Sequence, residues 1–181
     1  LNPILAKVDA TDAERRFSLS TFRNDVPDSL DAQILHDAAP VFARGEKMQL
    51  TYSVRNTHRA VGTRLSSEIV TRLKDRPLAD DHVTIRLRGS AGQSLGAFLV
   101  RGVKLEVFGD ANDYVGKGLS GGTIVVRPAV SSPLASQDNT IIGNTVLYGA
   151  TSGHLFAAGQ AGERFAVRNS GATVVVEGCG A

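Results

Sequence analysis

Apolar and polar residues alternate in two stretches of the first half of the chain. The apolar positions are Met48, Leu50, Tyr52 and Val54 in the first stretch, and Val83, Ile85 and Leu87 in the second. Successive side chains of a strand point to opposite faces, so this period of two predicts two half-buried β-strands. The second strand leads directly into a glycine-rich region that fills the rest of the chain.

Two other stretches have the spacing of a helix. The first helix is predicted over residues 30–39, with Asp28 or Ser29 as its N-cap. Pro40 is expected to end or kink it, and Gly45 follows as a stop signal. The second helix has one apolar stripe at i, i+4 and i+8, formed by Leu65, Ile69 and Leu73.

Four segments of the second half share one pattern: a Gly or Asn, a second Gly nine or ten residues later, and then a β-rich run. They start at Gly92, Asn112, Gly143 and Gly162, and their second glycines are Gly102, Gly121, Gly153 and Gly171. The starts are 20, 31 and 19 residues apart, and an insertion near residues 127–139 accounts for the long interval. A fixed period near twenty is typical of a solenoid, whose copies bury their apolar side chains only when stacked.

We therefore predict a mainly β fold: a right-handed, single-stranded parallel β-helix over residues 85–178, preceded by a short α/β segment. Each coil is expected to hold two or three short strands joined at corners, where glycine adopts a positive φ without steric strain. The predicted corner glycines are Gly92, Gly96, Gly102, Gly109, Gly116, Gly118, Gly121, Gly143, Gly153, Gly162 and Gly171. A β-sandwich with many glycine turns is the alternative, although its strands seldom keep a common period.

The predicted organisation has three parts. Residues 1–27 form a connecting tail, residues 28–84 an α/β segment that covers the first edge of the solenoid, and residues 85–181 the β-helix. A solenoid that ended at Ala181, just after a strand, would expose an unpaired strand ladder, which natural solenoids cover with a cap. We expect the sequence to be a piece of a longer polypeptide, truncated at its C-terminal end, with further coils after Ala181.

Composition narrows the class of protein. The 181 residues are 42% hydrophobic and carry a net charge of +2 without a clustered basic stripe, so neither nucleic acid nor an anionic membrane is an expected partner. No apolar run reaches the ~20 residues needed to span a bilayer, and no signal peptide opens the chain. The single cysteine, Cys179, excludes an internal disulfide and fits a reducing, cytoplasmic location.

Two glycine motifs match active-site patterns but lack the context that such sites need. Residues 92–96 match the G-x-S-x-G nucleophile elbow, with His154 later in the chain as a base, yet no helix fits before Gly102. Residues 116–121 match G-x-G-x-x-G, yet a predicted strand follows in place of the helix whose N-terminus would hold a phosphate. We predict glycine corners at both places.

A calcium loop and a metal centre are also not expected. Asp110, Asn112 and Asp113 begin like a calcium loop. The third ligand position is Tyr114, however, so we expect the three polar side chains to bond turn backbone. No two histidines are at metal-ligand spacing, and Cys179 is predicted to be a small corner residue. We predict no catalytic, cofactor-binding or metal-binding residue in this segment.

Three surface hypotheses follow from the polar residues. Many hydrogen-bonding groups share one short stretch, which is either a charged surface loop or, as we favour, an interdomain contact: Arg55, Asn56, His58 and Arg59. A candidate carboxylate site, whose arginines would equally pair with neighbouring domains or face water, consists of Arg86, Arg88 and Arg101. A carbohydrate-active β-helix enzyme would need a ladder of acids on one face of the coils, and the repeat positions show none.

A known family is similar to most of this chain. Residues 89–126, with the specific segment GDANDYVGKGLSGG, resemble the C-terminal domain of the glutamate synthase large subunit. So do the runs RNTHRAVGTRLSSEI, GNTVLYGATSG and AGERFAVRNSGATVVVEG, and the similarity covers residues 29–178. His58 replaces the family's usual Asp, and Leu95 stands at a usually aromatic site. A weaker resemblance links the glycine-rich coils to the C subunit of formylmethanofuran dehydrogenase.

The resemblance implies a role in ammonia assimilation. It implies an enzyme that turns glutamine, 2-oxoglutarate and reducing equivalents into two glutamates, with an amidotransferase domain and an FMN and iron–sulfur synthase domain in the same polypeptide. It also implies a small flavoprotein subunit as partner. The β-helix domain of that family is not known for catalytic residues and holds the catalytic domains in position, so no cofactor is expected within this segment.

Overall fold

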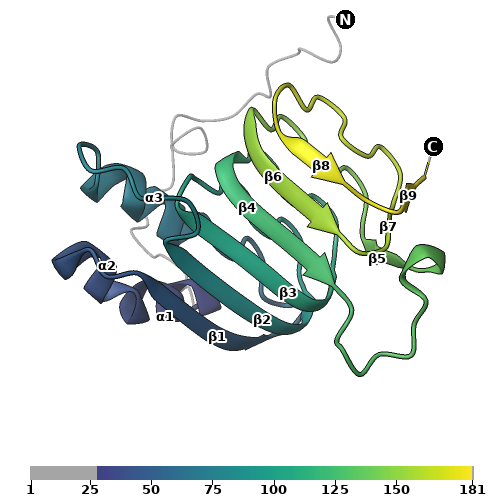
Figure 1. Cartoon of the computed structure of the whole chain (residues 1–181), viewed down its shortest axis with the longest axis horizontal. Helices are drawn as coiled ribbons and strands as arrows, with labels where there is room; N and C mark the ends of the chain where they lie inside the picture. Colours follow the sequence, from purple (N-terminus) through teal and green to yellow (C-terminus); the bar gives the residue numbers. More distant parts are fainter. Residues whose placement is uncertain (1–27, 181) are drawn as a thin grey trace, which may run out of the picture.

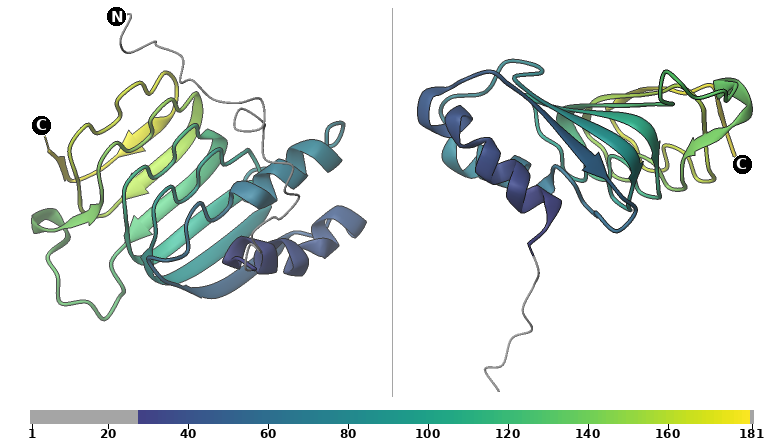
Figure 2. Two further views of the ribbon diagram at one scale, coloured as in Figure 1. Left: turned by 180° about the vertical axis from the view of Figure 1, so that it is seen from behind. Right: turned by 90° about the horizontal axis from the view of Figure 1, so that it is seen from below.

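The fold is known from a computed structural model, which describes residues 28–180 (Figure 1). Its helices and strands are α1 (Leu30–Asp37), α2 (Ala39–Arg44), β1 (Met48–Val54), α3 (Thr63–Arg72), β2 (Val83–Ala91), β3 (Val103–Ala111), β4 (Ser120–Arg127), the 3-10 turn η1 (Ser136–Asp138), β5 (Thr140–Ile142), β6 (Ser152–Ala157), β7 (Gln160–Ala161), β8 (Thr173–Val175) and β9 (Gly178–Cys179). The predicted tail, residues 1–27, lies outside the described residues. The fold is mainly a curled parallel β-sheet with few helices (Figure 2).

Six strands stack in chain order as successive parallel neighbours: β1, β2, β3, β4, β6 and β8. We call this ladder the sheet wall. Its register follows the pairs Val83–Val103, Lys104–Thr123, Thr123–His154 and His154–Thr173, which are 20, 19, 31 and 19 residues apart. These separations confirm the predicted period. The insertion that contains η1 produces the interval of 31 residues.

A second, shorter ladder starts from the C-terminal end of β3, where Ala111 pairs with Ile142 of β5. It continues from β5 to β7 and from β7 to β9. The expectation of two or three short strands per coil is wrong for β2 and β3, because each is one continuous strand of 9 residues. Gly89 and Gly109 pair within these strands with positive φ values of 121° and 153°, which lets the strands change direction without ending.

The N-terminal α/β segment extends the same sheet. β1 pairs in register with β2, from Met48–Val83 to Val54–Gly89. The single helix predicted over residues 30–39 is in fact two helices, because α1 ends at Asp37 and Pro40 lies in the first turn of α2. Proline is tolerated there because the first amides of a helix have no partner within it.

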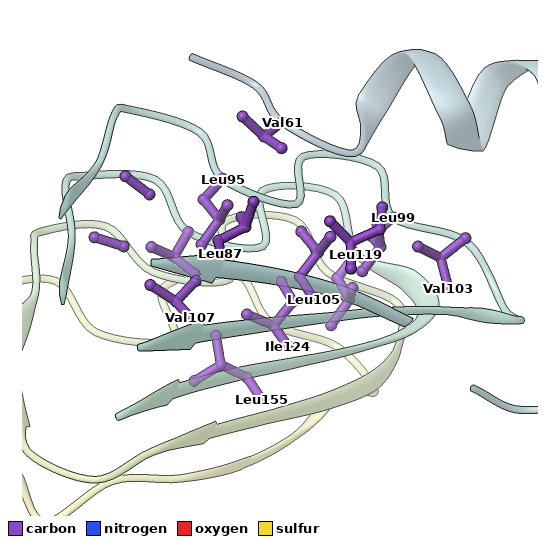
Figure 3. Close-up of a cluster of buried hydrophobic side chains, with 14 of the residues drawn as sticks. Val61, Leu87, Leu95, Leu99, Val103, Leu105, Val107, Leu119, Ile124 and Leu155 are labelled. Atoms are coloured by element: carbon purple, nitrogen blue, oxygen red, sulfur yellow. The ribbon is translucent and has the colours of Figure 1, made fainter. Parts of the chain in front are cut away.

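The core lies between the sheet wall and the segments that return across the other side of each coil. Figure 3 shows side chains from both sides meeting, among them Leu105 and Ile124 from strands and Leu95, Leu99 and Leu119 from the return segments. One register row, Ile85, Leu105, Ile124 and Leu155, is fully buried along its length. Each such side chain stabilises the fold by about 1.5–3 kcal/mol.

The helices are short. α3, the longest helix between residues 28 and 180, has 10 residues. In the part of the chain that the structure describes, no helix has the length and hydropathy to cross a membrane.

Candidate functional site

The return segments form the most unusual surface of the molecule. Within each of them every second residue has a positive φ: Ser94, Gly96 and Phe98; Tyr114, Gly116 and Gly118; Thr145, Leu147 and Gly149; Arg164, Ala166 and Arg168. Overlapping turns accompany this alternation, since the Ala97 N–H donates to the Ser94 carbonyl at 3.0 Å and the Leu99 N–H to the Gly96 carbonyl at 3.1 Å. We call these four runs (residues 94–98, 114–118, 145–149 and 164–168) the turn wall.

The coils of the turn wall are hydrogen-bonded to one another. The N–H groups of Ser94 and Phe98 donate to the following coil, at the carbonyls of Asp113 (2.8 Å) and Lys117 (2.7 Å). The Gly96 N–H, between them, donates backwards to the Val61 carbonyl at 2.9 Å. The alternating backbone therefore presents donors in both directions along the stack, and the turn wall is a second ladder opposite the sheet wall.

The predicted corner glycines divide into two groups with different physical reasons. Those with positive φ are Gly96, Gly102, Gly109, Gly116, Gly118, Gly121 and Gly153. Gly92, Gly143, Gly162 and Gly171 are absent from the positive-φ residues, so the expected reason does not apply to them. A Cβ atom at these four positions would collide with polar atoms of the neighbouring coil, such as the Asn56 carbonyl at Gly92.

The G-x-S-x-G residues are part of the turn wall. Ser94 has a φ of 63° and is followed by a second turn at Gly96, so no helix stands behind it. His154 belongs to β6 of the sheet wall, where its ring stacks on Phe156 with centroids 6.1 Å apart. The structure gives Ser94 and His154 separate surroundings on two different walls of the coil.

The G-x-G-x-x-G residues have the backbone of the turn wall as well. Gly116 and Gly118 have positive φ, and their N–H groups donate to the carbonyls of Leu95 and Tyr148, each at 2.9 Å. β4 begins at Ser120, within the motif. These two N–H groups, which a phosphate would need as donors, already bond carbonyls of adjacent coils. A strand follows the motif in place of the helix whose N-terminus would hold the phosphate.

Two of the three side chains of the acidic run bond turn backbone, as expected. Asn112 Oδ1 accepts the Asp113 N–H at 2.8 Å, and Asp113 Oδ1 accepts the Asn144 N–H of the next coil, also at 2.8 Å. Asp110 differs from the expectation, because its carboxylate accepts a side-chain hydrogen bond from the Ser90 hydroxyl at 3.0 Å. Between residues 28 and 180, no group of three His, Cys, Asp or Glu side chains is placed to hold a metal ion.

The three arginines of the candidate carboxylate site do not share a site. Arg86 donates to Glu106 at 3.0 Å, and Glu106 also pairs with Arg127 at 3.5 Å. Arg101 pairs with Asp80 at 2.8 Å. In the register row that contains it, Glu106 is followed by Val125, Phe156 and Val175. That row therefore carries no ladder of acids.

The stretch of Arg55, Asn56, His58 and Arg59 follows β1 directly. The His58 carbonyl accepts the Gly92 N–H at 3.1 Å, and the Arg55 N–H donates to His58 Nδ1 at 3.2 Å. Arg55, Asn56 and Arg59 are exposed. Beside this stretch lies an open hollow of about 800 Å³, lined by polar groups that include Tyr52 and His36. The backbone of the stretch thus serves the coil, and its arginine side chains face outward.

A buried carboxylate that sequence reasoning missed joins α1 to α3. Asp31 is 6% exposed and accepts the N–H groups of Gly62 at 2.7 Å and Arg64 at 2.6 Å. Burial raises the pKa of the Asp31 carboxyl, and these two hydrogen bonds partly offset that effect. Asp31 looks like an ordinary first-turn acid of α1 in the sequence. Its partners lie about thirty residues away, so local pattern carried no signal for them.

Comparison with known proteins finds clear relatives. The model of the GXGXG motif family matches residues 31–181. Over 180 residues the chain is 70% identical to a glutamate synthase (NADPH) large chain of Azospirillum brasilense, a match that covers 99% of this chain and 12% of that protein. It is 50% identical over 148 residues to a glutamate synthase (NADH) of Saccharomyces cerevisiae, covering 82% of this chain and 7% of that protein. A glutamate synthase (NADPH) large chain of Bacillus subtilis is 48% identical over 156 residues, covering 86% of this chain and 10% of its own length.

Proposed function

The chain belongs to the GXGXG family, and from this membership we propose that it is a structural, non-catalytic domain of a glutamate synthase large chain. In this role it holds an amidotransferase domain and an FMN and iron–sulfur synthase domain at a fixed separation. Its relatives are named glutamate synthases. The segment spans 12% of the length of the A. brasilense relative, so the reaction itself is proposed for the complete protein.

The proposed reaction consumes glutamine, 2-oxoglutarate and reducing equivalents and yields two glutamates. The proposed partners are the other domains of the same polypeptide and a small flavoprotein subunit, in the cytoplasm. The interdomain contact at Arg55, Asn56, His58 and Arg59 is part of this proposal. The outward position of Arg55 and Arg59 after β1 supports it, because both side chains are free to meet a neighbouring domain.

The observation that carries the structural role is the double ladder. The sheet wall joins coils through strand pairs, and the turn wall joins the same coils through bonds such as the Ser94 N–H to the Asp113 carbonyl. A stack bonded on two sides resists bending toward either side. The residues that match active-site motifs form hydrogen bonds between coils. The N–H groups of Gly116 and Gly118, for example, both donate to carbonyls of adjacent coils.

The finer description of the fold is also a proposal. We infer that the coils wind as a right-handed, single-stranded parallel β-helix over residues 85–181, with residues 28–84 as an α/β segment at its first edge. Parallel pairing of each strand of the sheet wall with the next one in that wall supports this, since crossovers between parallel strands are right-handed in about 98% of cases. The pairing of β1 with β2 supports a first segment that is continuous with the helix.

The cofactors of the proposed enzyme do not fit the residues of this segment. Iron–sulfur clusters are held by several cysteine thiolates, and the whole sequence has one cysteine, the exposed Cys179. We place FMN and the iron–sulfur cluster in other domains of the complete protein. No step of the reaction is therefore assigned to residues of this segment.

The test replaces Gly96 by valine in the complete enzyme. Gly96 has a φ of 65°, and a Cβ atom there would lie 2.5 Å from Ile124 Cδ1, so a valine must distort the coil. We expect glutaminase activity and ammonia-dependent synthesis to remain. Glutamine consumed per reductant oxidised should rise, because a distorted coil would no longer hold the amidotransferase and synthase domains at the separation that lets the synthase domain use the ammonia released from glutamine.

The matched control is Gly45→Val at the end of α2. Gly45 has a similar φ of 69°, but no atom lies within 4 Å of a Cβ built there. We expect the control to keep the normal glutamine-to-reductant ratio. If Gly96→Val loosens β2–β4 in hydrogen exchange and leaves that ratio unchanged, the structural role in coupling is wrong.

A further inference from the structure

We propose that the outward side chains of the turn wall, here called the turn face, dock against an acidic surface of another domain of the same polypeptide. This inference deepens the proposed function, because it rests on the segment working inside a longer chain. It assigns a surface and a partner chemistry to the role of holding domains in place.

The first observation is a group of exposed aromatic rings. Phe98 is 55% exposed, Tyr114 39% and Tyr148 37%. They belong to adjoining coils, since the Gly118 N–H bonds the Tyr148 carbonyl and a Cβ atom at Gly118 would lie 2.6 Å from the Phe98 ring. A groove of about 400 Å³ along Phe98 continues the surface onto α3, where Val70 is 55% exposed. Interfaces are enriched in such rings.

The second observation is a set of cations without acidic partners. Lys117 lies over the Tyr114 ring and Arg168 over the Tyr148 ring, each at 5.9 Å from the centroid. Arg164, in the same run of the turn wall as Arg168, is exposed. Among the residues that the structure describes, none of these three cations forms an ion pair. Positive charge next to aromatic rings is a composition that binding surfaces favour.

The cations of the sheet wall differ from those of the turn face in their ion pairing. Three of the four Lys and Arg side chains of the sheet wall are paired within the segment: Arg86 and Arg127 meet Glu106, and Lys104 meets Asp81 at 3.6 Å. Arg88 of β2 is the exception among the residues that the structure describes. Most cations of the sheet wall thus have an acidic partner within the segment, whereas the three cations of the turn face have none among the described residues. An acidic partner would complete the charge of the turn face.

Backbone strain points the same way. Phe98, Gly118, Gly149 and Arg168 occupy one position of successive coils, all with positive φ. Glycine satisfies this backbone without strain, as Gly118 and Gly149 show, whereas phenylalanine and arginine are strained there. The outer two coils therefore keep a side chain at a conformational cost, and such outliers cluster at functional surfaces.

The occupant follows from how much polypeptide surrounds the segment. A relative 70% identical to this chain is about eight times longer, because the match covers 12% of it. Most of that relative lies outside the matched segment, so its other domains are tethered to that segment at a high effective concentration. We therefore assign the turn face to a domain of the same polypeptide, whose contacting surface carries aspartate and glutamate.

The experiment is zero-length carbodiimide cross-linking of the complete large chain, which joins a lysine to a carboxylate in direct contact. Mass spectrometry should find Lys117 joined to an Asp or Glu outside residues 28–180. The Lys104–Asp81 pair, at 3.6 Å, is the internal positive control. Arg168→Glu should lower the yield of the Lys117 product about tenfold, since like charges across an interface oppose docking. Arg88→Glu, at an exposed arginine of the sheet wall, should leave it unchanged.

Three outcomes overturn the proposal. One is a Lys104–Asp81 product without any Lys117 product beyond this segment. The second is a Lys117 product to a separate subunit or a second copy. The third is an equal loss of yield in Arg168→Glu and Arg88→Glu. The Gly96→Val coupling ratio is an independent readout: if it fails while Lys117 cross-links as expected, the turn face stands and the coupling role does not.

Discussion

The two walls of the coil solve the same problem with different backbones. In the sheet wall, residues such as Ile124 and Val125 alternate between the core and the outside, as in any strand. In the turn wall, every second residue has a positive φ, and the donors alternate between the coil before and the coil after. Both walls are ladders of backbone hydrogen bonds, yet only the turn wall demands a conformation that most residues avoid.

This difference teaches where the stack is sensitive to sequence. The sheet wall accepts any apolar residue of suitable size at its inward positions, because strand backbone suits them all. The turn wall has two constraints at each position, φ and the space in the neighbouring coil. Leu147 occupies a position where the two preceding coils have Gly96 and Gly116, and its Cδ2 lies 2.8 Å from a Cβ built at Gly116, so the inward space is shared unevenly among coils.

The largest expected effect separates the two faces of the sheet wall. Ile124→Ala should destabilise the stack by about 2–5 kcal/mol, since Ile124 is fully buried and its loss leaves a cavity. Val125→Ala, one residue along β4 and on the outer face, should cost about 1 kcal/mol or less. Hydrogen exchange of β3 and β4 amides in the complete large chain measures both opening free energies. Equal losses would mean that the outer face is also packed.

A glycine pair separates strain from packing within the turn wall. Gly116 and Gly149 have nearly the same φ, 66° and 67°. A Cβ atom at Gly116 would lie 2.8 Å from Leu147 Cδ2, whereas Gly149 has no atom within 4 Å. Gly149→Ala should cost about 1–2 kcal/mol from backbone strain, and Gly116→Ala about 1–3 kcal/mol more from overpacking. Exchange of the 114–119 amides reports the difference, and identical costs would show that packing adds nothing.

Asp31 of α1 anchors the first coil through the start of α3. Asp31→Asn should cost about 1–3 kcal/mol, because an amide offers one acceptor oxygen where the carboxylate accepts from Gly62 and Arg64. Hydrogen exchange of the amides at the start of α3 measures this loss of stability. A Ser29→Ala variant tests an ordinary helix cap in the same region, where Ser29 accepts the Ala32 N–H at 3.3 Å.

The difference in stability between the native chain and the Asp31→Asn variant should change with pH in a definite direction. Burial raises the folded-state pKa of Asp31 above its ordinary value of 3.8, so ionisation opposes folding. The stability from the neutral group is fully present below 3.8 and is lost as pH rises through the folded pKa. The advantage of the native chain over Asp31→Asn should therefore shrink as pH rises across that window. An advantage that grows with pH would show that the two N–H donors outweigh burial.

The smallest effect is expected for the charges of the sheet wall. Glu106→Gln removes the partner of Arg86 and Arg127, whose side chains are 42% and 40% exposed. Glu106 itself is only 15% exposed, but both arginines reach solvent, and ion pairs at the surface contribute about 0–1 kcal/mol. The loss should therefore stay within that range and decrease at high salt. Glu177→Gln, at an exposed acid of the last coil, is the control with no expected change.

The amino-acid sequence determined the repeat and the inward rows. Glycine spacing and apolar alternation marked the coils, and the strand register reproduces their intervals. The helix over Leu65, Ile69 and Leu73 followed from its stripe. These features were readable because they depend on residues close in the chain, through the periods of two and twenty that strands and stacked coils impose.

Tertiary structure alone decided what the return segments are and which groups they use. A positive φ is unfavourable for the side chains of Ser94, Tyr114 and Arg164, so their residue types did not predict this conformation. Their conformation is imposed by donors and acceptors in neighbouring coils, and the Asp31 anchor depends on a helix about thirty residues away. Both are contacts between distant parts of the chain, which exist only once the coils have stacked.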